Sequence, residues 1–204
     1  MRVLWTIKEL GLDVELVPVD LMSLDHHRPE YAALNPNKAV PVLEWQEETT
    51  GQRHSMFESA AIVRLLAERH GRRLMPRREE DWAQFEQTYA WAAVTLDMLL
   101  WNIRVVQDFR DGADKEFLSI QCAKWNENVC PQLETLCSRE FVCGDQFTIA
   151  DVLVHYQLFW AEKYRRQKLI SIGPKALAYA KRMSSRPAFV AATADKAGFK
   201  AAKL

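Results

Sequence analysis

Four cysteines are the side chains with the widest chemistry in this sequence, because a thiol can act as a nucleophile, a redox group or a metal ligand. They are Cys122, Cys130, Cys137 and Cys143. No two of them form a Cys-x-x-Cys pair, and no histidine stands beside them at metal-binding spacing. The first three fall within a helical pattern. We therefore expect buried or half-buried free thiols in a reducing compartment, with a redox role as the alternative.

A second group of side chains carries positive charge or can gain it near neutral pH. His26 and His27 are adjacent, and Lys38 follows an Asn-Pro break. Histidine changes charge close to neutral pH, so each of the two can be either a ligand or a solvated surface residue. Lys38 can equally be an exposed loop lysine. The basic run 163–168 is interpreted as a solvated helix end, with a docking patch for an acidic partner as the alternative.

The first 75 or so residues, which must position these groups, mix helix and strand patterns. Apolar residues at helical spacing predict a helix from the start of the chain, which Gly11 ends. Alternation and turn residues predict strands at 14–19, 40–45 and Arg53–Phe57, the last two forming a hairpin. Short helical patterns occupy Pro29–Leu34 and the segment up to Gly71.

The remainder of the chain has the spacing of helices almost throughout. Residues 74–76 are interpreted as a linker. Long helices are predicted at 82–99 and 115–137. Thr148 and Asp151 predict a capping box at the start of another helix. Further helices are expected near residues 172–183 and from Pro187, a proline suited to a first turn. The predicted domains are 1–73 and 79–204.

Composition sets broad limits on function. The 204 residues contain 27 Lys plus Arg and 27 Asp plus Glu. A net charge of zero argues against nucleic acid or an anionic membrane as the main partner. No apolar run reaches the roughly 18 residues of a membrane-spanning helix, and Lys8 and Glu9 are incompatible with a signal peptide. We expect a cytoplasmic protein without bound metal.

Four short motifs give the chain a recognisable family pattern. They are Asn35–Glu44 (NPNKAVPVLE), Phe57–Ile62 (FESAAI), Thr148–Asp151 (TIAD) and Arg186–Phe189 (RPAF). In order and spacing they resemble the corresponding motifs of cytosolic glutathione transferases over nearly the whole chain. The resemblance implies a thioredoxin-like amino-terminal domain followed by an all-α domain, that is, an α+β fold joined to an all-α fold.

The resemblance also implies a glutathione site. The Val40–Pro41 peptide is expected to be cis, with the Val40 backbone pairing with the tripeptide as a strand would. Glu58 suits the γ-glutamyl ammonium, and Ser59 with the helix amides suits its carboxylate. Lys38, His26 and His27 are candidates for the glycyl carboxylate. In the simpler alternatives, Pro41 only starts a strand and Glu58-Ser59 only caps a helix.

Two departures from the family pattern affect this expectation. Many members carry Gln, Lys or Thr where this chain has Ala39, so one contact to the tripeptide is expected to be missing. Members also open with a strand and a loop bearing a Ser, Tyr or Cys, and the sequence here begins at the following helix. Ser23 and Ser55 are available hydroxyls, but the spacing of neither residue indicates a catalytic role. We therefore name no catalytic residue. One of three arrangements is expected to take the place of the missing strand: an unrecorded amino-terminal segment, which we rank first, a strand lent by a partner chain, or pairing of 14–17 with 40–45.

In this family the second substrate binds against the first long helix of the helical domain. Met98, Trp101, Arg104 and Val105 are the corresponding candidates, although an aromatic stripe of this kind is more often core. The expected function is a glutathione transferase that conjugates hydrophobic electrophiles, as in detoxification, or a related glutathione-dependent enzyme. The alternative is a non-catalytic module that binds glutathione or a protein. We expect a homodimer with glutathione as co-substrate.

Overall fold

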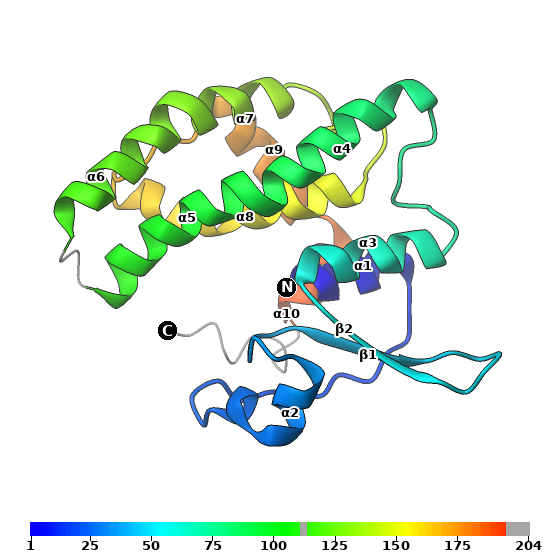
Figure 1. Ribbon diagram of the computed structural model, residues 1–204. Coiled ribbons are helices and arrows are strands. Elements are labelled where there is room, and N and C mark those ends of the chain that lie inside the picture. Colours follow the sequence, from blue (N-terminus) through cyan, green and yellow to red (C-terminus); the bar gives the residue numbers. More distant parts are fainter. Residues whose placement is uncertain (111–113, 195–204) are drawn as a thin grey trace. The chain divides into compact units, whose positions relative to one another are not determined.

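The computed structural model describes residues 1–110 and 114–194 (Figure 1). It divides into two compact units, one of Met1–Arg73 with Pro187–Leu204 and one of Leu74–Arg186. The predicted domains, 1–73 and 79–204, remain predictions. Residues 111–113 and 195–204 of the second predicted domain lie outside the described residues.

The first unit combines helices with one β-hairpin. Its elements are α1 (Arg2–Leu10), the 3₁₀ turn η1 (Asp25–His27), α2 (Pro29–Leu34), β1 (Val42–Gln46), β2 (Arg53–Phe57), α3 (Ser59–Arg69) and α10 (Pro187–Ala194). The helix predicted from the start of the chain, Pro29–Leu34, the hairpin and the helix before Gly71 are confirmed. The first predicted hairpin strand begins at Val42 rather than residue 40, because Pro41 has no N–H to donate to a strand partner.

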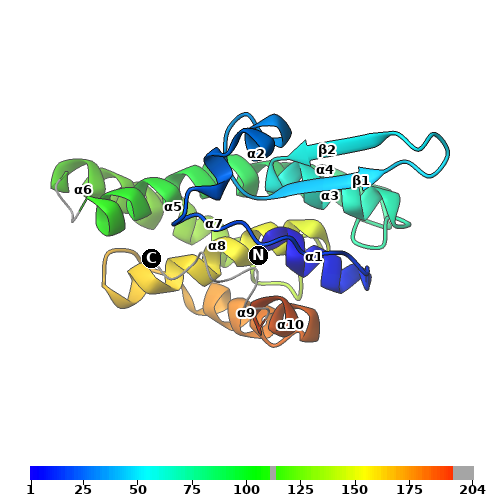
Figure 2. The same cartoon turned by 90° about the horizontal axis from the view of Figure 1, so that it is seen from below.

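The core of the first unit lies around α1, which packs on both α3 and α10 (Figure 2). Trp5 is fully buried, and its ring meets that of Phe189 edge to face with 4.9 Å between centroids. Ile7 and Leu10 bury the same side of the helix. Gly11 ends α1 in the left-handed conformation, at φ 68°, which costs glycine little.

Residues 14–19 form no strand, so this prediction is wrong. A strand requires a neighbour for its backbone N–H and C=O groups, and within the described residues β1 and β2 pair only with each other. The segment instead has no regular secondary structure and is largely solvated, with Val17 74% exposed. The proposed pairing of 14–17 with 40–45 is wrong for the same reason. Alternating apolar residues alone could not supply the missing partner.

The second unit is helical throughout its described residues. In order it contains η2 (Glu79–Asp81), α4 (Trp82–Trp91), η3 (Ala92–Leu96), α5 (Asp97–Arg104), η4 (Val105–Phe109), α6 (Lys115–Lys124), η5 (Trp125–Val129), α7 (Cys130–Leu136), α8 (Ile149–Arg166) and α9 (Pro174–Ser184). The segments η3, η4 and η5 are π-helical. They follow their neighbouring α-helices without a break, so the two predicted long helices are confirmed as continuous helical runs.

Helix α8 forms the centre of this unit and begins at the predicted capping box. The Thr148 hydroxyl and the Asp151 carboxylate cap the first turn reciprocally. Asp151 is fully buried and also accepts hydrogen bonds from the Val142 N–H and the Tyr179 hydroxyl, each 2.9 Å long. One carboxylate therefore joins the start of α8 to α9 and to the preceding loop.

All four cysteines are free thiols, as predicted. Cys122, Cys137 and Cys143 are buried and Cys130 is half-buried. Burial, together with the nearby Asp151 carboxylate, raises the pKa of both Cys137 and Cys143 to about 12. These two thiols are protonated at neutral pH and are therefore poor nucleophiles. Of the helices described here, none combines the length and the apolar character needed to cross a bilayer.

Candidate functional site

The hairpin brings together the two motifs that the sequence singled out in the first unit. In the β1–β2 register Val42 lies opposite Phe57. Residues 40–41, just before Val42, therefore lie beside residues 58–59, just after Phe57. The Val40–Pro41 peptide is cis, as expected. Val40 is 44% exposed, so this residue lies at the surface, where a peptide ligand could reach it.

The loop before Val40 is held by side-chain hydrogen bonds. Asn35 is buried, and its amide nitrogen donates to the Ala39 carbonyl over 2.7 Å. The Tyr31 hydroxyl donates to the same carbonyl over 2.8 Å. The Asn35 side-chain oxygen accepts from the Asn37 N–H. Asn35 and Tyr31 therefore fix the backbone that leads into Val40, a role that sequence reasoning did not assign to either residue.

Glu58 has an unusual backbone conformation for a residue with a Cβ. It precedes α3 with φ 70° and ψ 106°. Its side chain is exposed and makes no capping hydrogen bond to the helix. The interpretation of Glu58 as a simple helix cap therefore loses its main support. Conformations of this kind cost about 1–3 kcal/mol and cluster at ligand sites, where the surrounding structure maintains them.

A pair of substitutions measures this backbone cost. We expect Glu58→Gly to raise the free energy of unfolding by about 1 kcal/mol relative to Glu58→Ala, because glycine adopts a positive φ without a Cβ clash but loses more entropy on folding. Urea unfolding of the two variants gives the difference. Both variants lack the carboxylate, so the comparison isolates the backbone. Equal unfolding midpoints would show that Glu58 is not strained.

Arg2 is a site residue that sequence reasoning missed. It is 8% exposed, and its guanidinium donates to the Ser59 hydroxyl oxygen over 3.0 Å. Helix geometry leaves the first amides of α3 to find partners outside the helix, and the helix dipole makes this end positive. Arg2 adds a full positive charge at the same place, which favours a bound carboxylate. The available signal was the i, i+4, i+8 spacing of Arg2, Thr6 and Leu10, which puts Arg2 on the buried face of α1.

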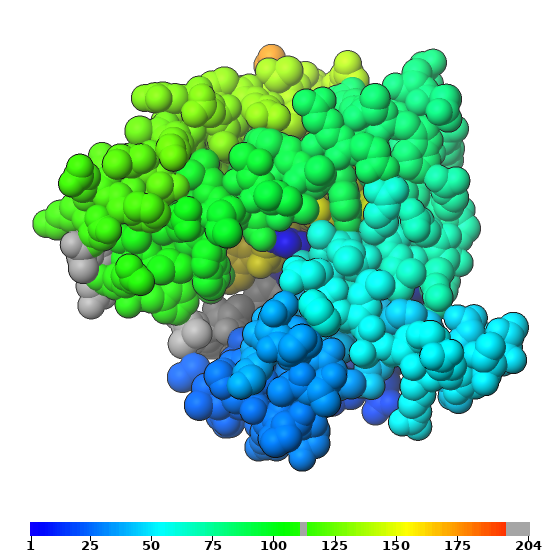
Figure 3. Space-filling model, in the orientation of Figure 1, coloured from blue at the N-terminus to red at the C-terminus, as the bar shows by residue number. Residues whose placement is uncertain are grey.

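The other predicted residues of this site lie on surface segments. His26 and His27 are in η1, with their ring centroids 4.4 Å apart. Lys38 is exposed in the loop before Val40, with φ 52°. The space-filling view shows the segment around η1 and α2 (blue) at the surface (Figure 3). A role for these three side chains in ligand binding remains a prediction.

The hydroxyls considered for catalysis differ in their surroundings. Ser23 donates to the Asp20 carboxylate over 3.0 Å, and the Ser23 N–H donates to the other oxygen of that carboxylate. Ser23 is therefore part of a local turn. Ser55 is exposed on β2 opposite Glu44. Neither arrangement singles out a catalytic residue.

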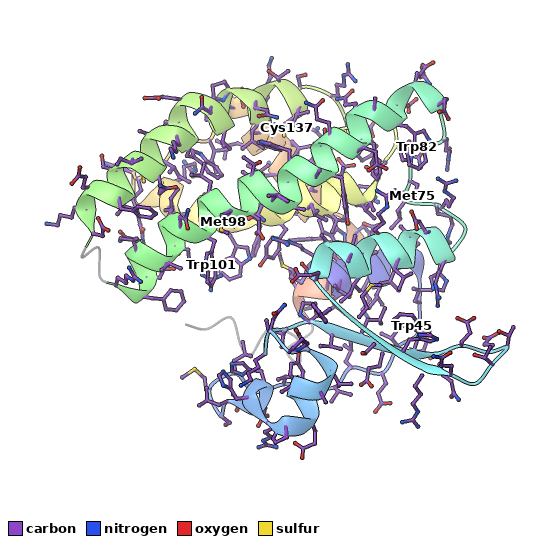
Figure 4. The ribbon with its side chains drawn as sticks, viewed as in Figure 1. Trp45, Met75, Trp82, Met98, Trp101 and Cys137 are labelled. Atoms are coloured by element: carbon purple, nitrogen blue, oxygen red, sulfur yellow. The ribbon has the colours of Figure 1, made fainter. Side chains whose placement is uncertain are left out.

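The candidates in the second unit lie along one continuous helix. Met98 and Trp101 are on α5, one turn apart, and are 58% and 50% exposed (Figure 4). They are therefore not core residues. Arg104 ends α5 with its guanidinium 5.6 Å from the centre of the Trp101 ring. Val105 begins η4 and is half-buried.

The segment η4 adds a ring to this group. A π-helix bonds residue i to residue i+5, so residues five apart lie close together. Phe109 is five residues after Arg104, and the guanidinium lies 5.8 Å from its ring centre. Trp160 of α8 contributes a third ring, 4.8 Å from the same guanidinium. We call Arg104, Trp101, Phe109 and Trp160 the arginine–aromatic cluster.

Two protein-family models match this chain. A family model described as "Glutathione S-transferase, N-terminal domain" matches residues 1–74, and one described as "Glutathione S-transferase, C-terminal domain" matches residues 112–187. Glutathione S-transferase 3 of Zea mays is 28% identical over 201 residues, covering 93% of this chain and 86% of its own. Glutathione S-transferase PM239X14 of Arabidopsis thaliana is 31% identical over 160 residues, covering 74% and 71%.

Solved structures share the fold. A glutathione transferase from Pseudomonas putida, with one glutathione disulfide bound per subunit, superposes with a TM-score of 0.84 at 20% identity, covering 94% of this chain and 84% of that one. Glutathione transferase F7 from Populus trichocarpa gives a TM-score of 0.79 at 25% identity, covering 95% and 92%. These similarities support a thioredoxin-like small domain joined to a helical domain.

Proposed function

The chain belongs to the glutathione S-transferase family, and we propose that it binds glutathione beside Val40, Pro41, Glu58 and Ser59 and transfers it to a hydrophobic electrophile. The observation that carries this proposal is the hairpin register, which places residues 40–41 beside residues 58–59. Family membership alone does not establish an activity, because related folds host different chemistry. The proposal is supported by the match between the groups of this site and those of the tripeptide.

Each charged group of glutathione has a complementary group in the first unit. The γ-glutamyl carboxylate suits the amino end of α3, where the Arg2 guanidinium meets the Ser59 hydroxyl. The γ-glutamyl ammonium suits the exposed carboxylate of Glu58. The backbone of Val40 supplies strand-like hydrogen bonds to the middle of the peptide. Lys38, His26 and His27 remain candidates for the glycyl carboxylate.

The electrophile is assigned to the exposed side of α5. Met98 and Trp101 offer apolar surface at the end of a long helix, and Arg104 and Val105 follow in the next turn. Half-exposed apolar side chains of this size usually have a binding role when they are grouped. Conjugation would form a bond between the glutathione sulfur and an electrophilic carbon, with release of the leaving group and of the thiol proton.

A second candidate is glutathione binding without catalysis. It is favoured by the environment of Ser23, whose hydroxyl and backbone are both bonded to Asp20. Conjugation of an aryl halide by the full chain, compared with the uncatalysed rate at equal glutathione concentration, distinguishes the two candidates. Binding without rate enhancement would support the second.

Calorimetric titration with glutathione tests the proposed site. We expect Glu58→Ala to weaken binding roughly 10- to 100-fold, because the change removes a charge-assisted hydrogen bond worth about 1.5–3 kcal/mol. Glu44→Ala is the matched control, since Glu44 is an exposed carboxylate in the same hairpin. Absence of binding at millimolar glutathione, or equal affinities in the two variants, would refute the assignment.

We also infer a cytoplasmic homodimer, from the resemblance to this family and the balanced charge of the chain. The interface is expected to include the helical run from Trp82 to Trp101. Sedimentation at micromolar concentration checks this expectation, and a monomer under those conditions would contradict it.

A further inference from the structure

The arginine–aromatic cluster holds a cation in an unusual environment. The Arg104 guanidinium has three aromatic rings within 6 Å, those of Trp101, Phe109 and Trp160. Ring faces attract a cation but do not neutralise its charge. Among the described residues Arg104 makes no ion pair, and its Nε is enclosed without a hydrogen-bond acceptor. The Trp160 indole nitrogen is also enclosed without an acceptor there.

The carboxylate closest in sequence to this arginine is already engaged. Asp108, four residues further on, accepts a hydrogen bond from the Tyr164 hydroxyl over 2.7 Å. Its other oxygen pairs with the Lys163 ammonium, also over 2.7 Å. Burial, together with the shared Asp108 carboxylate, raises the pKa of Tyr164 well above its usual range, so the tyrosine stays a donor. Asp108 therefore neutralises Lys163 rather than Arg104.

The surrounding sequence has an excess of positive charge. Residues 104–109 and 162–166 contain four cations, Arg104, Lys163, Arg165 and Arg166, and two carboxylates, Asp108 and Glu162. Glu162 is bonded to both Arg165 and Arg166. The local net charge is therefore positive, and Arg104 is the cation whose guanidinium lies among exposed rings.

The rings of this cluster can be reached from solvent. Trp101 and Phe109 are each half exposed, and their ring centroids are 6.4 Å apart. Arg104 itself is half-buried, so its charge is only partly shielded from water. An ionic interaction in such a place is stronger than one at a fully solvated surface. The cluster therefore offers a flat apolar surface next to a guanidinium whose Nε has no acceptor among the described residues.

We propose that the arginine–aromatic cluster makes this site selective for aromatic compounds that carry a carboxylate or sulfonate group, with the ring against Trp101 and Phe109 and the anion on Arg104. This rests on the proposed function in that such compounds would be the second ligands of a glutathione-using protein. The selectivity itself is a property of the second unit and can be measured without glutathione.

Two probes of the same shape test the selectivity. We expect the full chain to bind naphthalene-2-carboxylate at least about tenfold more tightly than naphthalene-2-carboxamide at pH 7 and low salt. The two compounds share their ring system and differ in charge. Quenching of tryptophan fluorescence or calorimetry gives both affinities. Equal affinities, or no saturable binding of either probe below millimolar concentration, would overturn the proposal without any variant being needed.

Three variants locate the effect. Arg104→Met is expected to bring the ratio of the two affinities close to one, and Trp101→Ala to weaken both probes by the same factor. Arg166→Met is the matched control, because Arg166 is a 75% exposed arginine paired with Glu162, and it should change the ratio less than twofold. A ratio preserved in Arg104→Met would assign the preference to other cations.

Glutathione titration of the same proteins separates this inference from the proposed function. Probe selectivity with no glutathione binding would leave the cluster assignment standing and refute the glutathione site. Glutathione binding without probe selectivity would do the reverse.

Discussion

Asp151→Ala is expected to lower the free energy of unfolding of the helical unit by about 3–5 kcal/mol. The carboxylate is fully buried and accepts hydrogen bonds from the Val142 N–H, the Thr148 N–H and the Tyr179 hydroxyl, each 2.9 Å long. Alanine would leave these buried donors without their acceptor and would also remove half of the capping box. Urea unfolding, followed by circular dichroism, measures the loss.

Asp145→Ala is the control for this prediction. Asp145 is an exposed carboxylate in the same loop, so its removal should change the free energy of unfolding by less than about 0.5 kcal/mol. If both variants were equally stable, the Asp151 network would not be a main source of stability in this unit.

The second large effect concerns acid stability and His155. This side chain is fully buried in α8, and burial lowers its pKa to about 3. In the unfolded chain the same imidazole gains a proton near pH 6.5. The contribution of neutral His155 to the free energy of unfolding is therefore fully present above pH 6.5. It is lost as the pH falls toward 3, because the unfolded state then binds a proton that the folded state does not. Between pH 7 and pH 4 the loss is about 3 kcal/mol.

His155→Leu should remove this part of the pH dependence. Asp151 titrates in the same window with the opposite sign, because burial raises its pKa to about 6 and its folded form gains a proton first as the pH falls. The informative quantity is therefore the difference between wild type and variant in the change from pH 7 to pH 4. His70→Gln, at an exposed position, is expected to leave that change unaltered. Parallel pH curves for wild type and His155→Leu would contradict the prediction.

Local chemistry predicted the features that depend on neighbouring residues. The apolar spacing of α1, its glycine stop, the hairpin turn and the capping box at Thr148 all follow from residues a few positions apart. Each satisfies backbone groups within its own segment. The strand predicted at 14–19 failed because a strand needs a partner elsewhere in the chain, which no local pattern specifies.

In the candidate site too, local contacts could be predicted from the sequence and long-range contacts could not. The motif residues 40–41 and 58–59 could be paired from the sequence, because one hairpin connects them. The contact of Arg2 with Ser59 spans 57 residues, and that of Arg104 with Trp160 spans 56. Contacts of this kind depend on how helices pack, and the spacing of apolar residues in one helix does not determine which side chain of another it meets. The strained backbone of Glu58 was likewise invisible, since glutamate has no preference for that conformation.

The π-helical segments have a consequence for how the chain tolerates changes in length. A π-bulge holds one residue more than the α-helical path that it replaces. Loss of one residue within Ala92–Leu96 could therefore be absorbed by reversion to an ordinary α-helix, with α4 and α5 keeping their buried faces. Helix α5 contains no extra residue, so the loss of one residue within it would rotate the following side chains by about 100° around the helix axis. Single-residue deletions should therefore be far less damaging at η3, η4 and η5 than in the helices between them.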